Sequence, residues 1–179
     1  MGLLVLGLHV GSMPVGASVP SYRVTTSIGG FSQPFGLVMN TEGTQLWVAD
    51  RGDGTVKEVD LTGTPRVVAT VGGMGGPMDL ALDAATSELW VADAFGGAVR
   101  EISTGPTPAE VASIGGFGQP GGIAVAPTSG DVWVSDVTGG TVSRIAPLPS
   151  PHIVDTVSGL NRPAGVALSQ DGRQLWVAE

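Results

Sequence analysis

The chain has 179 residues and a formal net charge of −8, from 16 acidic and 8 basic residues. An acidic chain without a basic stripe argues against nucleic acid as a partner, because contacts to phosphate dominate that affinity. The absence of cysteine excludes disulfides, thiolate metal sites and cysteine nucleophiles. No apolar stretch reaches the roughly 18 residues that a membrane-spanning helix needs.

Residues 1–20 allow two interpretations. Leu3–Val10 is largely apolar, and the small residues at 15–17 resemble a signal-peptide cleavage site. This interpretation predicts a secreted or periplasmic protein, although the first basic residue, Arg23, lies after the apolar stretch. The alternative is a degraded partial blade of the repeat described next, because a shift of one period places Leu3 on Leu46.

A period of 43 residues runs through the remainder of the chain, 21–179. Tryptophan, proline, glycine and an acidic residue each recur at this spacing without insertion or deletion. The four series are Trp47, Trp90, Trp133 and Trp176; Pro34, Pro77, Pro120 and Pro163; Gly30, Gly73, Gly116 and Gly159; and Asp50, Asp93, Asp136 and Glu179. Four residue types in one register indicate a structural repeat.

Each period is predicted to contain four short strands separated by glycine-rich turns and proline-containing loops. The first strands, rich in small and β-branched residues, are 36–39, 79–82, 122–125 and 165–168. The second are 46–49, 89–92, 132–135 and 175–178; the third are 55–59, 98–102 and 141–145; the fourth are 23–28, 66–71, 110–114 and 152–157. No segment sustains a helical period, so we expect essentially no helix.

Four antiparallel strands in a repeat of this length are typical of a β-propeller blade. The sequence therefore predicts an all-β propeller with complete blades at about 29–71, 72–114 and 115–157 and a partial blade at 158–179. The tryptophans are expected between neighbouring blades. The favoured interpretation is a fragment of a larger propeller; the alternative is a closed ring of four blades, completed by the N-terminal strand.

The segment Leu160-Asn161-Arg162-Pro163-Ala164-Gly165-Val166-Ala167, followed by Leu175-Trp176-Val177-Ala178, resembles the NHL repeat. The Gly-Thr-Val runs at 54–56 and 140–142 are equally similar to the YVTN relatives of that superfamily. The third strands lack the Asn-x-Arg element that is usual in NHL repeats. The resemblance implies a propeller fold, and its relatives include gluconolactonase-like hydrolases and streptogramin-lyase-like enzymes.

Four aspartates are the candidate metal ligands. Asp50, Asp93 and Asp136 end successive second strands, so they share one end of the propeller with the proline-containing loops; we call this end the loop face. An acidic ring there could hold Ca²⁺ or another divalent cation, but the favoured interpretation is hydrogen bonding to the turns that follow. Asp79 replaces the glycine of positions 36, 122 and 165, which makes it the foremost candidate for a site that departs from the repeat.

The expected function is that of a non-enzymatic scaffold that binds a protein, peptide or glycan on the loop face. The alternative, implied by the resemblance, is a metal-dependent lactonase-like hydrolase or a streptogramin-type lyase. The only histidines are His9 and His152, and neither is placed beside a nucleophile, which argues against a Ser-His-Asp site. No cofactor other than such a cation is expected.

Overall fold

The computed structural model describes residues 2–8, 24–147 and 149–179. All regular structure in these residues is β-strand, as predicted. None of the described residues forms a helix that could traverse a lipid bilayer. The proposed cleavage site at 15–17 lies outside the described residues.

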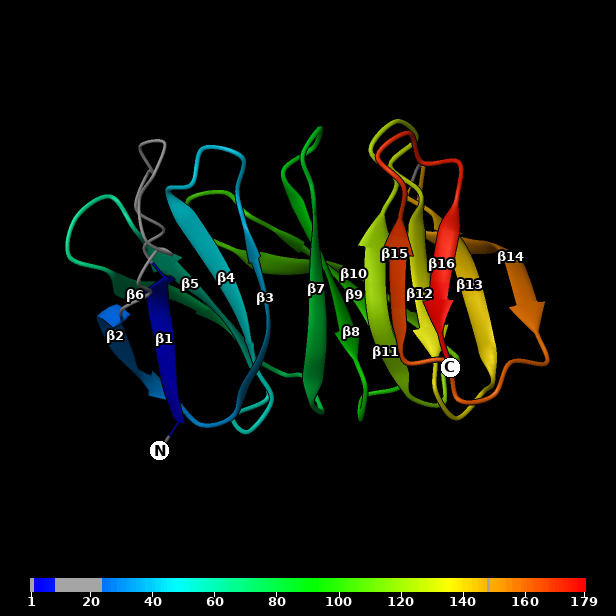
Figure 1. Ribbon diagram of the computed structural model, residues 1–179, viewed down its shortest axis with the longest axis horizontal. Helices are drawn as coiled ribbons and strands as arrows, with labels where there is room; N and C mark the ends of the chain where they lie inside the picture. The colour runs from blue at the N-terminus through cyan, green and yellow to red at the C-terminus, as the bar shows by residue number, and fades with distance from the viewer. Residues whose placement is uncertain (1, 9–23, 148) are drawn as a thin grey trace, which may run out of the picture.

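Three four-stranded antiparallel sheets form the complete blades (Figure 1). Blade 1 comprises β3 (Pro34–Met39), β4 (Gln45–Asp50), β5 (Thr55–Asp60) and β6 (Arg66–Val71). Blade 2 comprises β7 (Pro77–Asp83), β8 (Glu88–Asp93), β9 (Ala98–Ser103) and β10 (Ala109–Gly115); blade 3 comprises β11 (Pro120–Val125), β12 (Val132–Asp136), β13 (Thr141–Ala146) and β14 (His152–Ser158). Two-stranded sheets flank them: β1 (Gly2–Leu8) with β2 (Val24–Phe31), and β15 (Gly165–Leu168) with β16 (Leu175–Ala178).

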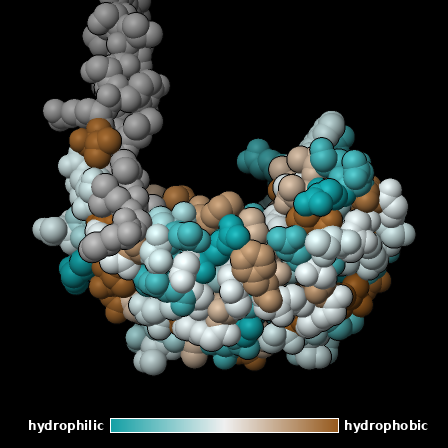
Figure 2. Space-filling view, turned by 90° about the horizontal axis from the view of Figure 1, so that it is seen from below, coloured by the Kyte–Doolittle hydropathy of each residue, from teal (hydrophilic) through white to brown (hydrophobic). Residues whose placement is uncertain are grey.

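The blades form an open arc. The inner strands β3, β7, β11 and β15 adjoin one another in chain order, and the sheets β1–β2 and β15–β16 lie toward opposite ends of the long axis (Figure 1). Seen from the loop face, the molecule is a crescent hollowed on the side of the inner strands (Figure 2). The described residues therefore form a partial propeller, as the favoured interpretation predicts, and not a closed ring of four blades.

The N-terminal strand occupies a different place from the one that the repeat period predicts. The period aligns Leu3 with Leu46 of a second strand, but β1 pairs directly with β2, the copy of an outer strand. Leu4 lies opposite Ile28 as Val56 lies opposite Val71 in blade 1. Because pairing with an outer strand is the property of a third strand, β1 takes the third-strand position.

The tryptophans pack between blades where a following blade is present. Trp47 lies in one buried cluster with Leu80 and Leu89 of blade 2, and Trp90 lies in another with Ile123 and Val132 of blade 3. These two indoles are at most 1% exposed, which confirms the prediction for them. Trp133, facing the short β15–β16 sheet, is half-buried. For Trp176 the prediction is wrong: it is 67% exposed, because no described sheet covers its face.

The turn between the second and third strands also joins neighbouring blades. Gly97 has a φ of +61°, in the left-handed region that glycine tolerates, and a Cβ there would lie 2.8 Å from the carbonyl oxygen of Phe117. The N–H of Phe117 donates a hydrogen bond of 3.2 Å to the Gly97 carbonyl. Glycine at this position therefore permits close docking of the turn on the loop that enters the next blade.

A polar pair recurs on the tryptophan face of each blade and changes chemically from blade to blade. In blade 1 Gln45 donates a hydrogen bond to Glu58, and in blade 3 Arg144 pairs with Asp131. Blade 2 places two acids there, Glu88 and Glu101. Burial and the hydrogen bond and charge of Glu88 raise the pKa of Glu101 to about 7. Two carboxyl groups so close favour sharing one proton.

This acid pair predicts a pH-dependent stability. Between about pH 4.5 and pH 7 the folded state binds a proton at Glu101 that the unfolded state releases, so stability falls as the pH rises through this window. We expect the variant Glu101→Gln to remove a decline on the order of 1–2 kcal/mol. Urea unfolding at pH 5 and pH 7.5 measures it, with the exposed Glu42→Gln as the control. Equal declines in both variants would contradict the assignment.

Candidate functional site

The aspartates that end the second strands hold the loop face together. Asp50 accepts hydrogen bonds from the backbone N–H groups of Ser32 and Gln33, and Asp93 accepts them from Gly75 and Gly76. Asp136 accepts bonds of 2.7 Å and 2.8 Å from Gly118 and Gln119. In each case the donors lie in the loop that enters the inner strand of the same blade.

The turns after these strands add further donors, as the hydrogen-bonding interpretation predicts. Gly96 donates 3.1 Å to Asp93, and Gly139 donates 3.0 Å to Asp136. Burial raises the pKa of Asp136, but the backbone donors outweigh it and hold that pKa below its ordinary value. A buried carboxylate surrounded by N–H groups stays charged because these donors replace water.

Two of the three carboxylates also have a cationic partner. Lys57 Nζ lies 2.6 Å from Asp50, and Arg100 Nε lies 2.8 Å from Asp93. Burial raises the pKa of Asp50, but the hydrogen bond from Lys57 and the backbone donors outweigh it and lower the pKa overall. Blade 3 has Ser143 where blade 1 has Lys57, so the cation differs between blades while the backbone bonds recur.

The hypothesis of a cation held by the aspartate ring stays a prediction. The carboxylate oxygens of Asp50, Asp93 and Asp136 are engaged by backbone donors within their own blades. Among the described residues, no group of three or more histidine, cysteine, aspartate or glutamate side chains is arranged to hold a metal ion. Within the same part of the chain, Asp79 belongs to no such group either.

Asp79 instead lies in a cavity where the inner strands converge at the loop face. Its Oδ1 accepts from the N–H of Leu80 at 2.9 Å and its Oδ2 from the N–H of Ile123 at 3.1 Å, which links blade 2 to blade 3. Burial raises its pKa, and the two hydrogen bonds oppose this. The cavity measures about 430 Å³ and is lined by Phe35, Met78, Asp79, Val137 and the glycine- and alanine-rich starts of the other inner strands.

The glycines of the same register explain why a side chain is unusual there. A Cβ on Gly36 would lie 2.5 Å from the Met78 carbonyl oxygen, and one on Gly122 would lie 2.8 Å from the Ala164 carbonyl oxygen. Neighbouring inner strands thus approach too closely for side chains at these positions. Asp79 is the exception in this register of positions 36, 79, 122 and 165, where the other three residues are glycine. It therefore contributes a polar side chain to the cavity.

Ser135 is a second departure from the repeat, and the sequence reasoning missed it. It stands where the other second strands have Ala49, Ala92 and Ala178. Its fully buried hydroxyl accepts from the N–H of Gly122 at 2.9 Å and donates to the carbonyl of Ala164 at 2.9 Å. Asp79 was singled out because it is a polar residue at a position where the other repeats have glycine. The same criterion, extended to positions where the other repeats have an apolar residue, would have identified Ser135.

A cluster of two aromatic rings and a guanidinium lies beside the cavity on the loop face. The guanidinium carbon of Arg51 is 4.7 Å from the ring centroid of Phe95 and 5.8 Å from that of Phe35. Both rings are more than half exposed. Phe35, the second residue of β3, also lines the cavity. We call these three residues the aromatic cluster; none of them recurs at its position in other blades.

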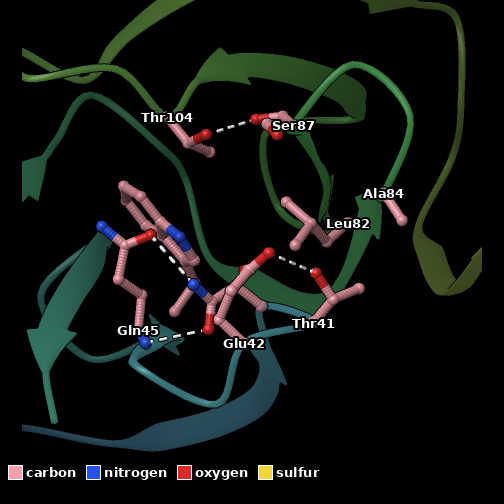
Figure 3. Close-up of a pocket in the computed structure, with 9 residues that line it drawn as sticks. Thr41, Glu42, Gln45, Leu82, Ala84, Ser87 and Thr104 are labelled. Carbon is pink, nitrogen blue, oxygen red and sulfur yellow. Dashed lines mark hydrogen bonds between the residues drawn. The ribbon is translucent and has the colours of Figure 1, made fainter. Parts of the chain in front are cut away.

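A smaller cavity of about 110 Å³ lies between blades 1 and 2 at the opposite ends of the strands, with Trp47 among its lining residues (Figure 3). Its polar side chains bond to close neighbours. Thr41 donates 2.9 Å to Glu42, and the hydroxyl of Thr104 donates to the carbonyl of Ser87 (Figure 3). Because these groups already have partners, this cavity is a weaker candidate than the one at Asp79.

Comparisons with known proteins address the fold. No family model and no curated protein matches the sequence. Among solved structures, Kuenenia stuttgartiensis hydrazine synthase is similar with a TM-score of 0.75 and 20% identity over 93% of this chain and 45% of that chain. A Bacteroides uniformis protein provisionally described as a 6-phosphogluconolactonase has a TM-score of 0.70 and 15% identity over 94% of this chain and 59% of that one.

Staphylococcus aureus virginiamycin B lyase is also similar, with a TM-score of 0.65 and 19% identity over 82% of this chain and 49% of that chain. The chain therefore spans about half the length of these structures. At such identities the likeness establishes the fold alone. The blades, their order and these structural neighbours together show a β-propeller fold.

Proposed function

We propose that this chain is a non-enzymatic binding scaffold that recognises a peptide segment on its loop face. The observation that supports this most is the aromatic cluster beside the Asp79 cavity. Exposed aromatic rings and arginine are the side chains most enriched at the centres of protein interfaces. The aspartate ring, in contrast, recurs in every blade, as expected of architecture.

The chemistry of the surface suggests how the peptide binds. The cavity offers an apolar and glycine-rich wall with one carboxylate, so it suits an apolar side chain or a basic group next to Asp79. The stacked guanidinium of Arg51 offers donors to a peptide carbonyl or carboxylate. An extended segment that crosses from blade 2 toward the axis would contact both features.

The proposal predicts that Phe95→Ala weakens peptide binding without affecting folding. Peptides selected by the wild-type chain from a phage-displayed library of random linear peptides should bind the variant at least about tenfold more weakly, since loss of an interface anchor costs on the order of 2 kcal/mol. Val111→Ala, an exposed change on β10, is the control. Equal affinity of the wild type and Phe95→Ala, or a wild-type chain that selects no peptide, would refute the proposal.

The enzymatic alternative is favoured by one observation, the raised pKa of Asp79 in an axial cavity. A buried carboxyl group with a raised pKa is better suited to acid–base catalysis than an ordinary one, and the similar folds include a lyase and a protein described as a lactonase. Metal analysis of the purified chain distinguishes the two. A stoichiometric divalent ion that is lost in Asp79→Ala would favour the lactonase-like hydrolase or streptogramin-type lyase over the scaffold.

A further inference from the structure

A further cavity, of about 370 Å³, lies between blades 1 and 2 at the ends of the strands away from the loop face. It is lined by Glu58 and β6 of blade 1 and by the β9–β10 loop of blade 2. Gln45 and Thr104 line this cavity and also the smaller one (Figure 3), so the two cavities adjoin. We call the two cavities together the junction groove.

Glu58 is a buried carboxyl group for which the described residues supply no cation. It is only 7% exposed. Within the described part of the chain, its Oε1 accepts a hydrogen bond of 2.9 Å from the side-chain amide of Gln45, and its Oε2 has no partner. Burial and the negative charge of Asp60 raise the pKa of Glu58, and the bond from Gln45 opposes this. A cation in the junction groove would relieve the electrostatic cost that remains.

Blade 3 shows how the same two positions are neutralised within a blade. There Arg144 stands at the position of Glu58, and it pairs at 3.2 Å with Asp131 at the position of Gln45. In blade 2 both positions are acidic, so the two groups can share a proton. In blade 1 the amide of Gln45 donates a hydrogen bond but brings no charge. Of the pairs in the three complete blades, only this one joins an acid to a neutral side chain.

The walls beside Glu58 suit the aliphatic stem of an arginine. Ala69 lies directly opposite Glu58 in the β5–β6 ladder, so a small side chain adjoins the carboxyl group on the same face of the blade. Val68, which is 46% exposed, and Pro106 add apolar surface. A guanidinium suits this half-enclosed place better than an ammonium group, because it is more weakly hydrated and its donors match a carboxylate.

We propose that the junction groove binds an arginine side chain from an extended segment of a partner protein. The guanidinium pairs with Glu58, the stem packs on Val68 and Pro106, and residues next to the arginine continue into the smaller cavity. Neither cavity has a basic side chain among its described lining residues, and the net charge of −8 favours a cationic partner. The groove lies away from the loop face, so it is separate from the peptide surface proposed above.

NMR titration of the ¹⁵N-labelled 179-residue chain tests the site with a capped pentapeptide that has arginine between pairs of alanines. We expect saturable shifts of the Gln45 side-chain amide and the Gly105 backbone amide. The same peptide with citrulline in place of arginine should bind at least about tenfold more weakly, because citrulline keeps the shape but lacks the charge. Equal affinity for the two peptides, no saturable shifts, or shifts confined to Gly121 and Gly122 at the axial cavity would overturn the proposal.

Matched variants test the role of Glu58. Glu58→Gln keeps the shape of the side chain and should weaken binding of the arginine peptide at least about tenfold. Glu42→Gln removes the same charge from an exposed residue of the smaller cavity and should weaken it less than about threefold. Equal weakening by both changes would show that general negative charge attracts the peptide, and would contradict the site.

A double variant keeps the test decisive should Glu58→Gln fail to fold. Gln45→Asp/Glu58→Arg copies the pair that blade 3 has at these positions. It should fold, because the pair is already accommodated in the same place of another blade, and its own guanidinium should abolish binding of the arginine peptide. Unchanged affinity in this folded variant would refute the assignment of Glu58 as the partner of the arginine.

Discussion

Truncating Trp90 to alanine should lower the free energy of unfolding by about 3–5 kcal/mol. The side chain is fully buried between blades 2 and 3, in one cluster with Ile123, Val132 and Ile145. Its removal leaves a cavity at a blade junction that the rigid backbones on both sides cannot close. Urea unfolding followed by circular dichroism measures the loss.

Two further variants test whether the loss of stability in Trp90→Ala comes from lost packing between the blades. Among the described residues Trp90 Nε1 has no hydrogen-bond partner, so Trp90→Phe keeps most of the packing and loses no bond. We expect it to cost no more than about 2 kcal/mol. Phe95→Ala removes a ring that is 58% exposed and should change stability by about 0.5 kcal/mol or less. Similar losses for Trp90→Ala and Phe95→Ala would show that Trp90 does not join the blades.

The blade architecture could be predicted from the sequence because the period is uninterrupted. Each recurring residue has one recurring cause: tryptophan fills the space between blades, and aspartate binds the loop N–H groups. What the period could not predict is the state of the ends. The exposure of Trp176 depends on whether a sheet lies beyond it, and the pairing of β1 depends on register rather than on composition.

The candidate site was harder to predict, since sites depend on what differs between repeats. Asp79 was identified because it breaks a series of glycines, and the structure places it in the axial cavity. Ser135 breaks a series of alanines in the same way but was overlooked. The aromatic cluster could not be predicted from the sequence. Its residues, Phe35, Arg51 and Phe95, come from two blades, and each lies in a different strand end or turn. Only three-dimensional proximity brings them together.

The second large effect is expected from Lys57→Met, which should destabilise the protein by about 3 kcal/mol at neutral pH. Lys57 is buried, and its ammonium group lies 2.6 Å from Asp50, 2.7 Å from Asp53 and 2.7 Å from the carbonyl oxygen of Gly30. Methionine preserves the length of the stem but leaves the buried Asp50 carboxylate without its cation. Chemical unfolding at pH 7 provides the measurement.

The pH dependence of the stability of Lys57→Met identifies the cause of its destabilisation. In the wild type the pKa of Asp50 is lowered, so its contribution is present above the unfolded pKa of about 3.8 and is lost as the pH falls through the folded value. Without Lys57 that pKa should rise, and Lys57→Met should lose stability at a higher pH than the wild type.

The double variant Lys57→Met/Asp50→Asn removes both charges and should be more stable than Lys57→Met alone, because an unpaired buried charge costs more than an absent pair. Were the double variant the less stable of the two, the unpaired Asp50 carboxylate would not be the cause of the loss; the lost contact of the Lys57 ammonium group, 5.2 Å from the centroid of the Phe31 ring, would be the alternative. Blade 3 differs in this respect: Asp136 has Ser143 at the lysine position, and backbone donors from both of its loops hold the carboxylate in place of a cation.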